Sequence, residues 1–399
     1  MVCMPKKRLL VVTELYPYPG NIYLGTFVTS QIQLLKSDYD ITVLTVYPSV
    51  LRFFRKQPAY SRYDSEVLVI SVQYYPLLLY ACKMLGVLPS LCSYVNKRIV
   101  HRKLLIAARK LHSANPFDLV HGHEVYIGDE AGPIGRALHI PSVFTLHSFY
   151  SYHKKIFGKF VVKKAICNLQ LCTKNISVSS IAAESYIAQG ISRNSFSIIA
   201  NGINQIHSNA KNQRIVDFSH GRKVLLSVGY LTVDKRFDLS IRALSKLPPQ
   251  DAVLILVGIG KEKKRLENLA QSLHCADRIL FLGAVPPPKM QEVYQSADVL
   301  IHPSTIDSFS MVCLEAMSYG KVVICTNVIG ICEYTENQKN ILIVSPNNGE
   351  QLLHAIRQVI NRPEEYTRIS ENARVLANTL TWDRQVQLIK RVYKDAIAS

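Results

Sequence analysis

Residues 303–320 contain the pattern that most clearly points to chemistry. Asp307 lies in an expected loop, and Glu315 follows eight residues later inside an expected helix. The backbone N–H groups of residues 310–312 then stand at the N-terminus of that helix, where anions bind well. Taken singly, Asp307 fits a turn and Glu315 fits a buried acid. Together with the segments that follow, they predict a site for an anionic ligand.

Two adjacent cations supply a second part of such a site. Lys235 and Arg236 come shortly after an expected strand and its terminal Gly229, before an expected helix. Cations at this position can neutralise a diphosphate. The glycine-rich turn at residues 258–261 is followed by neither Lys-Ser nor Lys-Thr, so a P-loop is excluded.

The first half of the chain offers a glycine and several histidines at the ends of expected strands. Gly25 precedes an expected helix, where the missing side chain lets the backbone approach a phosphate. His121, His123 and His147 stand at the carboxyl ends of strands, from which an imidazole can donate to an anionic oxygen. Each also fits a structural role. No further ligands stand at metal-binding spacing, so no metal site is predicted.

Alternating strands and helices must position these residues. Continuous apolar runs alternate with helical patterns throughout the chain, which is typical of parallel sheets covered by helices. The first series of expected strands is Arg8–Thr13, Ile41–Val46, Val67–Tyr74, Leu119–His121, Ser142–His147, Asn175–Ser179 and Ser197–Ile199. The second series is Lys223–Val228, Ala252–Val257, Ile279–Leu282, Val299–His302, Val322–Cys325 and Ile341–Val344.

The two series predict an α/β protein made of two Rossmann-like, doubly wound domains that face each other across a cleft. The polar stretch His207–Arg222 reads as the linker. The expected domains are therefore residues 1–205 and 206–382. Ligands of open parallel sheets bind beyond the carboxyl ends of the strands, which is where the residues above lie.

Composition agrees with two domains and excludes other classes. The 399 residues are 48% apolar, which is too high for a disordered chain. Nine scattered cysteines without a C-x-x-C pattern indicate neither a disulfide framework nor a zinc site. Unpaired thiols in a chain of this size fit a reducing compartment, so we expect a cytoplasmic protein.

The charge is positive and unevenly spread. The net charge is +18; residues 1–205 carry 23 Lys and Arg against 10 Asp and Glu. Basic clusters at 97–110 and 154–174, the second mixed with apolar residues in one expected helix, favour contact with an anionic membrane surface. The alternative is a solvated face. The apolar stretch Tyr74–Val95 is broken by prolines and a glycine and predicts partly buried helices. No nucleic-acid signature is present, so no nucleic acid partner is expected.

In this order, the segments resemble the retaining nucleotide-sugar glycosyltransferases of the GT-B fold, in the large family 4 group. The resemblance runs the whole length. Its most specific element is Asp307-x7-Glu315 followed by Ala316-Met317-x-x-Gly320. The supporting segments are Ile199–Asn204, Gly229 with Lys235-Arg236, Phe281–Gly283, Ala297-Asp298 with Pro303-Ser304, and Leu380–Trp382.

The resemblance implies roles for individual residues. Glu315 would hold the ribose hydroxyls of the donor, Asp307 would lie near the donor sugar, and Lys235 would bind the diphosphate. His147 would lie by the reacting centre. The catalytic set would be His147, Asp307 and Lys235, and the donor-binding set Gly25, Arg236, Phe309, Ser310, Met311, Val312 and Glu315. Backbone groups at 284–286 would contact the base, and the last helix, about 383–399, would return to the first domain.

The resemblance also implies the reaction. A hexosyl group would pass from a nucleoside-diphosphate sugar to an acceptor hydroxyl with retention, without a metal and without a cofactor besides the donor substrate. A lipid-linked or polysaccharide acceptor at the inner face of the membrane would suit the basic first half. Assembly of a capsule, an exopolysaccharide, a teichuronic-type polymer or a glycolipid is the corresponding expectation.

Three positions depart from the family pattern. Asp307 stands where the family usually has Glu, and Tyr230 stands where an Arg often follows the glycine. Asn204 replaces the Asp that usually ends Asn-Gly-x-Asp. The first two changes leave open an alternative, a non-catalytic member that binds nucleotide sugar or scaffolds a partner.

Overall fold

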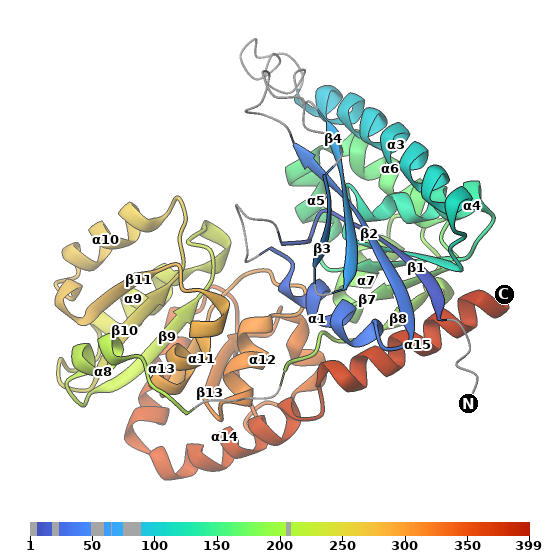
Figure 1. Cartoon of the computed structure of the whole chain (residues 1–399). Helices are drawn as coiled ribbons and strands as arrows, with labels where there is room; N and C mark the ends of the chain where they lie inside the picture. The colour runs from blue at the N-terminus through green and yellow to red at the C-terminus, as the bar shows by residue number, and fades with distance from the viewer. Residues whose placement is uncertain (1–5, 18–23, 49–59, 65, 75–88, 205–208) are drawn as a thin grey trace. The chain divides into compact units, whose positions relative to one another are not determined.

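The computed structural model describes residues 6–17, 24–48, 60–64, 66–74, 89–204 and 209–399 (Figure 1). By its internal contacts the chain divides into residues 1–200 with 382–399, here the N-terminal unit, and residues 201–381, the C-terminal unit. Each unit is built on one mostly or wholly parallel sheet with helices along its faces. This confirms the predicted α/β class with two Rossmann-like domains.

The N-terminal unit holds an eight-stranded sheet in the order β3-β4-β2-β1-β5-β6-β7-β8. The strands are β1 (Lys7–Thr13), β2 (Tyr39–Pro48), β3 (Tyr60–Asp64), β4 (Val67–Tyr74), β5 (Leu119–His123), β6 (Ser142–Leu146), β7 (Lys174–Ser177) and β8 (Phe196–Ile198). All neighbours pair in parallel except β3, which runs antiparallel to β4. The sequence does not predict β3, because its five residues include no aliphatic side chain.

The alternation of side chains along β1 assigns the two faces of this sheet. Leu9 and Val11 pack with α1 (Thr26–Leu35) and with the last helix, α15 (Trp382–Ala398). Leu10 and Val12 pack on the opposite face with α3 (Pro89–Ala114) and α4 (Ala131–Leu138). Burial of each such side chain stabilises the fold by roughly 1.5–3 kcal/mol. Because β1 has buried side chains on both faces of the sheet, it lies at the centre of the core of this unit.

The basic segment 154–169 is two helices, α5 (Tyr150–Phe157) and α6 (Lys159–Leu169), and the prediction of one continuous helix is wrong. Gly158 separates them with φ 82° and ψ 164°, a conformation that L-residues rarely adopt. The α7 helix (Ser180–Ile187) follows β7, and Ser179 caps it by accepting from the N–H of Ala182.

Lys97 is a second correction, because it does not belong to the surface basic cluster. Its side chain is 1% exposed and lies between α3 and the short helix η1 (Gly128–Glu130). Its Nζ pairs with Asp129 at 2.8 Å and Glu130 at 2.9 Å. Although burial alone would lower the pKa of Lys97, the two carboxylates raise it, so the ammonium remains charged.

The C-terminal unit holds a six-stranded sheet in the order β11-β10-β9-β12-β13-β14, parallel throughout. Its strands are β9 (Lys223–Val228), β10 (Ala252–Val257), β11 (Ile279–Gly283), β12 (Val299–His302), β13 (Val322–Thr326) and β14 (Leu342–Val344). Its helices are α8 (Gln213–Ser219), α9 (Phe237–Ser245), α10 (Lys263–Ser272), α11 (Pro287–Ser296), α12 (Met311–Ser318), α13 (Gly349–Asn361) and α14 (Pro363–Ala377).

The stretch predicted as a linker contains the α8 helix, and that prediction is wrong for residues 213–219. Asn212 caps the helix by accepting from the N–H of Ile215, whose side chain is buried. One buried apolar residue and a cap suffice for a short helix that rests against β10 and α11.

The strand orders locate the crevice of each unit. In the C-terminal sheet the chain leaves through β10 and β11 on one side of β9 and resumes at β12 on the other side. In the N-terminal sheet the corresponding neighbours are β1 and β5. Ligands of such sheets bind at the carboxyl ends of the strands where the order reverses. The segments after β1, β5, β9 and β12 are therefore the places to examine.

Two further expectations concern residues near the start of α3. Residues 75–88 of the apolar stretch Tyr74–Val95 lie outside the described residues. Across the parts of the chain that the structure describes, no helix combines the length and apolar character needed to cross a bilayer. Cys92 is disulfide-bonded, so the expectation of unpaired thiols is wrong there, whereas Cys167, Cys172, Cys275, Cys313, Cys325 and Cys332 are free.

Candidate functional site

The loops that follow β9 and β12 are joined at the crevice of the C-terminal unit. The β9 loop includes the short helix η3 (Val233–Lys235). The carbonyl of Asp234 in η3 accepts from the Thr305 N–H at 2.9 Å and from the Ser304 hydroxyl at 3.2 Å. Residues far apart in sequence are thus held at the same end of the sheet.

Lys235 and Asp307 form an ion pair in this crevice. Lys235 Nζ lies 2.9 Å from Asp307 Oδ2, and both side chains remain about one-fifth exposed, at 19% and 18%. Burial would raise the pKa of Asp307, but the Lys235 ammonium and a hydrogen bond from His302 outweigh it and lower that pKa. Asp307 is therefore an ionised carboxylate at neutral pH.

His302, at the end of β12, is the hydrogen-bond partner of Asp307 that sequence analysis missed. Its Nε2 lies 3.1 Å from Asp307 Oδ2 and 3.3 Å from the Ser310 hydroxyl. The ring is 1% exposed, and burial lowers its pKa despite the adjacent carboxylate. A neutral ring whose Nε2–H donates to Asp307 fits this geometry. The signal was available, because His302 ends this strand as His123 ends β5, and His147 directly follows β6.

The N-terminus of the α12 helix follows Asp307 closely in the sequence. Ser310 has φ 75°, and its hydroxyl accepts from the Cys313 N–H at 3.4 Å. The first amides of a helix have no partner within the helix, so those of Met311 and Val312 are donors for an anion. The Phe309 ring is 1% exposed and packs edge-on against Tyr334 at 5.8 Å. Phe309 therefore supports the loop and offers a ligand only its backbone.

Glu315 lies on α12 and has one direct side-chain partner. Its Oε2 accepts from the Tyr294 hydroxyl at 2.6 Å. Burial raises the pKa of Glu315, and the Tyr294 hydrogen bond opposes that rise. Tyr294 is 1% exposed and stacks on Tyr319 with ring centroids 5.6 Å apart. Sequence analysis missed Tyr294, which gave no signal beyond its place in an expected helix before Asp298.

Arg236 does not join the ion pair of Lys235 and Asp307. The residue is left-handed, with φ 51°, and its guanidinium binds Asp238, with Nε 3.1 Å from Oδ1, and the Asn347 side chain. Tyr230, which stands where an arginine is usual, is 67% exposed. The structure thus brings Lys235, His302, Asp307 and Ser310 into one hydrogen-bonded group, with Glu315 further along α12 and Arg236 outside the group.

Gly25 and His147 belong to the N-terminal unit. Gly25 caps α1 with φ 63°, and a Cβ at this position would lie 2.2 Å from the carbonyl oxygen of Leu15. Only glycine fits such a close approach. Two residues further, the Phe27 ring lies 4.5 Å from the His147 ring, centroid to centroid. The helix start at Gly25 and the segment after β6 are therefore neighbours within this unit.

His147 is partly exposed and belongs to a group of three histidines whose other two members, His121 and His123, are buried. His121 Nε2 lies 2.7 Å from the Thr145 hydroxyl, and His123 Nδ1 lies 3.2 Å from His147 Nε2. Burial is the main cause that lowers the pKa of His121 to about 3 and that of His147 to about 4. It also lowers the pKa of His123 well below the usual value. These rings are neutral at pH 7, as hydrogen-bond donors or acceptors rather than cations.

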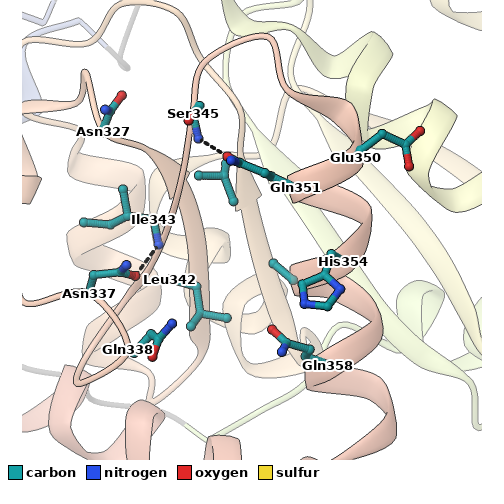
Figure 2. Close-up of a pocket in the computed structure, with 12 residues that line it drawn as sticks. Asn327, Asn337, Gln338, Leu342, Ile343, Ser345, Glu350, Gln351, His354 and Gln358 are labelled. Atoms are coloured by element: carbon teal, nitrogen blue, oxygen red, sulfur yellow. Dashed lines mark hydrogen bonds between the residues drawn. The ribbon is translucent and has the colours of Figure 1, made fainter.

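A separate hollow of about 490 Å³ lies beside the edge strand β14 in the C-terminal unit. Figure 2 shows the amide side chains that line it, which come from the segment before β14 and from α13. Asn337 accepts from the Ile343 N–H at 2.9 Å, and Gln351 accepts from the Ser345 N–H at 2.8 Å (Figure 2). These bonds occupy backbone donors of the edge, which discourages pairing with another strand. None of the predicted site residues line this hollow.

Within the described residues, no group of three or more His, Cys, Asp or Glu side chains is arranged to hold a metal ion. In the histidine cluster, His121 uses both ring nitrogens, on Tyr393 and on Thr145, and His123 Nδ1 contacts His147 Nε2. The positive charge at the candidate site comes from Lys235 and from helix amides.

Two Rossmann-like units, one with a cation, a carboxylate and a helix N-terminus at its crevice, form a fold and a site typical of proteins that bind nucleotides. Two family models match the chain: "Glycosyltransferase Family 4" over residues 34–205 and "Glycosyl transferases group 1" over residues 208–376. The chain belongs to this family of glycosyltransferases, which confirms the resemblance inferred from its motifs.

Similar proteins agree with that family. Two uncharacterized glycosyltransferases of Methanocaldococcus jannaschii are 30% and 26% identical over 187 and 291 residues. These matches cover 46% and 70% of this chain, and 48% and 75% of the respective relatives. The first match thus spans about half of that relative. The crystal structure of Anabaena HepE in complex with UDP matches with a TM-score of 0.74 at 19% identity, over 98% of this chain and all of that one.

Proposed function

We propose that the chain is a retaining glycosyltransferase that moves a hexosyl group from a nucleoside-diphosphate sugar to an acceptor hydroxyl. The observation that carries this proposal is the hydrogen-bonded group of Lys235, His302, Asp307 and Ser310 at the crevice of the C-terminal unit. The group places a cation, a carboxylate and a helix N-terminus together. Anabaena HepE, which shares the fold, has also been solved with UDP-glucose.

The cation and the helix amides would act on the leaving group. Negative charge grows on the departing diphosphate as the glycosidic bond breaks, and donors already aimed at that charge lower the barrier. Lys235 and the amides of Met311 and Val312 are such donors. Lys235 and Asp307 lie next to each other. The Lys235 ammonium would therefore bind a phosphate while the Asp307 carboxylate accepts from a hydroxyl of the adjoining sugar.

Glu315 would hold the ribose. The Tyr294 hydroxyl binds Oε2 of Glu315 at 2.6 Å, which fixes the carboxylate and leaves Oε1 to accept from a ribose hydroxyl. A half-buried carboxylate with one oxygen oriented by a hydrogen bond is well suited to a diol. Tyr294 therefore belongs to the proposed donor site as the residue that orients Glu315.

Retention would follow a front-face route. Asp307 is engaged by Lys235 and His302, so it is a poor nucleophile for a covalent intermediate. In the route that we propose, the bond from the anomeric carbon to the diphosphate oxygen breaks and the bond to the acceptor oxygen forms on the same face. The acceptor proton passes to the departing phosphate oxygen. A trapped glycosyl adduct on Asp307 would overturn this route.

The reaction would proceed without a divalent metal, because Lys235 and the α12 amides supply the positive charge that a metal would otherwise provide. Turnover should then survive chelation by EDTA. Loss of turnover in EDTA, restored by Mg²⁺ or Mn²⁺, would contradict this part of the proposal.

The acceptor would be a lipid-linked sugar or a growing polysaccharide at an anionic membrane, as in cell-surface polysaccharide or glycolipid assembly. Apolar side chains are exposed on α5 and α6: Tyr152 at 49%, Ile156 at 50% and Phe160 at 44%. Lysines stand among them, namely Lys154, Lys155, Lys159 and Lys163, which are also exposed. Exposed apolar side chains among lysines suit the interface of an anionic bilayer.

Release of nucleoside diphosphate from a panel of UDP, GDP and ADP sugars tests the function. We expect one donor class to be turned over, and Lys235→Ala to lower turnover by about 10²–10³-fold. Lys246→Ala, which removes an exposed lysine paired with Glu350, is the matched control and should leave turnover unchanged. Binding of a donor without release, in the presence of candidate acceptors, would favour the non-catalytic alternative.

A further inference from the structure

Glu124, immediately after β5, has a buried carboxylate with three partners. Its Oε2 accepts from the Ser148 hydroxyl at 2.8 Å. Its Oε1 accepts from the Val125 N–H at 3.0 Å and lies 2.7 Å from His153 Nε2. Burial would raise the pKa of Glu124, but the interaction with His153 outweighs it and lowers that pKa. The carboxylate is therefore charged and fully engaged.

The contacts of Glu124 continue into the α5 and α7 helices. His153 on α5 is 1% exposed, and its Nδ1 lies 2.5 Å from the Tyr186 hydroxyl on α7. Tyr186 is itself fully buried. Ser148, Glu124, His153 and Tyr186 thus form one chain of contacts from the segment after β6 to α7. Such a chain of contacts restricts its members to few arrangements.

Glu124 also takes part in the contacts that join the ends of β5 and β6. Its backbone N–H donates to the Thr145 carbonyl at 3.1 Å, and His123 next to it contacts the His147 ring at 3.2 Å. Ser148, which binds the Glu124 carboxylate, directly follows His147. The chain is therefore fixed on both sides of His147, at residue 145 and at residue 148, and its ring is contacted by His123.

The backbone at Glu124 is strained. Its φ is 68° and that of Tyr126 is 101°, which are left-handed values that residues with a Cβ rarely adopt. The Tyr126 carbonyl accepts from Lys97 at 2.8 Å, and the Tyr126 N–H donates to Asp129 at 2.9 Å. Lys97 and its buried partner Asp129 thus hold this loop in place. Strained residues persist where their surroundings over-determine them, and they concentrate at functional sites.

We propose that Glu124 is a positioning residue that fixes His147 for sugar transfer. This rests on the proposed function and on the role that the family resemblance implies for His147, beside the reacting centre. In this proposal the Glu124 carboxylate does not contact the donor. It holds Ser148, and with Ser148 the backbone that carries His147, against α5 and α7. The contacts described above are all made within the N-terminal unit.

Kinetics of paired variants test the proposal. We expect Glu124→Ala to lower kcat by more than tenfold and Ser148→Ala by about three- to tenfold, with the donor KM within twofold of the wild type. Glu124→Gln, which keeps the size and one acceptor oxygen, should recover part of the kcat lost in Glu124→Ala. Glu184→Gln is the control, since it removes an exposed carboxylate of the same unit, paired with Arg193, and should leave kcat unchanged.

A second measurement does not depend on turnover. The ring nitrogens of His147, labelled with ¹⁵N and assigned through His147→Gln, report the hydrogen bond and the exposure of the ring. In Glu124→Ala and Ser148→Ala we expect these signals to move toward those of a solvated imidazole, while Glu184→Gln leaves them in place. If wild-type protein turned over no donor, the proposed function would fail, and this measurement would still decide the positioning role.

Two results would overturn the inference. One is an unchanged His147 spectrum together with unchanged kcat in Glu124→Ala. The other is a loss of kcat in each variant that merely follows a lowered midpoint of unfolding, with no partial recovery in Glu124→Gln, which would make Glu124 a residue of stability alone.

Discussion

Asp307 shows how the length of one side chain decides what it can do. It stands where the family usually has glutamate, and its shorter carboxylate is held by Lys235 and His302. A carboxylate held by two partners is well oriented but less mobile, so in the proposed donor site the sugar would have to approach Asp307. The neutral His302 beneath it serves the same end, since its hydrogen bond fixes Asp307 without adding a competing charge.

The buried histidines give the N-terminal unit a pH-dependent stability. His121 is 0% exposed, and its pKa is lowered to about 3, against about 6.5 in an unfolded chain. Because the folded value lies below the unfolded one, the unfolded state takes up the proton first as the pH falls below 6.5. Stability is then lost between pH 6.5 and 3. At pH 5 we expect His121 alone to cost about 2 kcal/mol relative to pH 7.

Urea unfolding at pH 7 and pH 5 checks this expectation. His121→Gln should show a smaller loss of unfolding free energy between the two pH values than the wild type. His354→Gln, which alters an exposed histidine on α13, should keep the wild-type loss. Equal losses in all three proteins would mean that His121 titrates normally in the folded chain.

At the scale of elements, the start of α1 depends on one glycine. Gly25→Ala would place a Cβ 2.2 Å from the Leu15 carbonyl oxygen, so the loop after β1 or the helix must shift. Gly190 also has a positive φ, 96°, but nothing lies within 4 Å of its Cβ position. We expect Gly25→Ala to lower the unfolding free energy by about 1–3 kcal/mol more than Gly190→Ala. Denaturant unfolding measures the difference, and equal effects would contradict the close approach.

Most strands were predictable from the sequence because they are continuous apolar runs, as in Ala252–Val257. Failures occurred where the local pattern carried no such signal. The β3 strand has no aliphatic residue and forms only because β4 offers an edge. The α8 helix depends on a single buried isoleucine, and the break at Gly158 depends on its backbone conformation.

The candidate site was predictable in its residue types but not in its contacts. Lys235, Asp307 and Ser310 could be placed after strands, and parallel strands bring such positions to one edge. Side-chain direction could not be read in this way. Arg236 is adjacent to Lys235 yet binds Asp238 and Asn347. Of the neighbours that hold Glu315 and Asp307, Tyr294 is known only from packing, whereas His302 could have been found from its place at the end of β12.

At the scale of the whole molecule, the net charge of +18 and the lysines of α5 and α6 favour an anionic surface. We expect binding to anionic vesicles to weaken with salt. The double variant Lys154→Glu/Lys155→Glu should bind at least about 30-fold more weakly, because the loss of two lysines costs about 2 kcal/mol and the new carboxylates repel the surface. Lys263→Glu/Lys264→Glu on α10 makes the same charge change elsewhere and should have little effect. Equal retention of the wild type by neutral and anionic vesicles would contradict the electrostatic part.

Binding of nucleoside diphosphates, measured by calorimetry on the whole chain, tests the central claim most directly. The account predicts that UDP, GDP or ADP binds to the wild type and that Lys235→Ala and Glu315→Ala each weaken this binding at least tenfold. Lys246→Ala should bind like the wild type. Absence of binding by all three nucleotides, or equal affinity in all four proteins, would contradict the claim that the crevice beside β9 and β12 holds the donor.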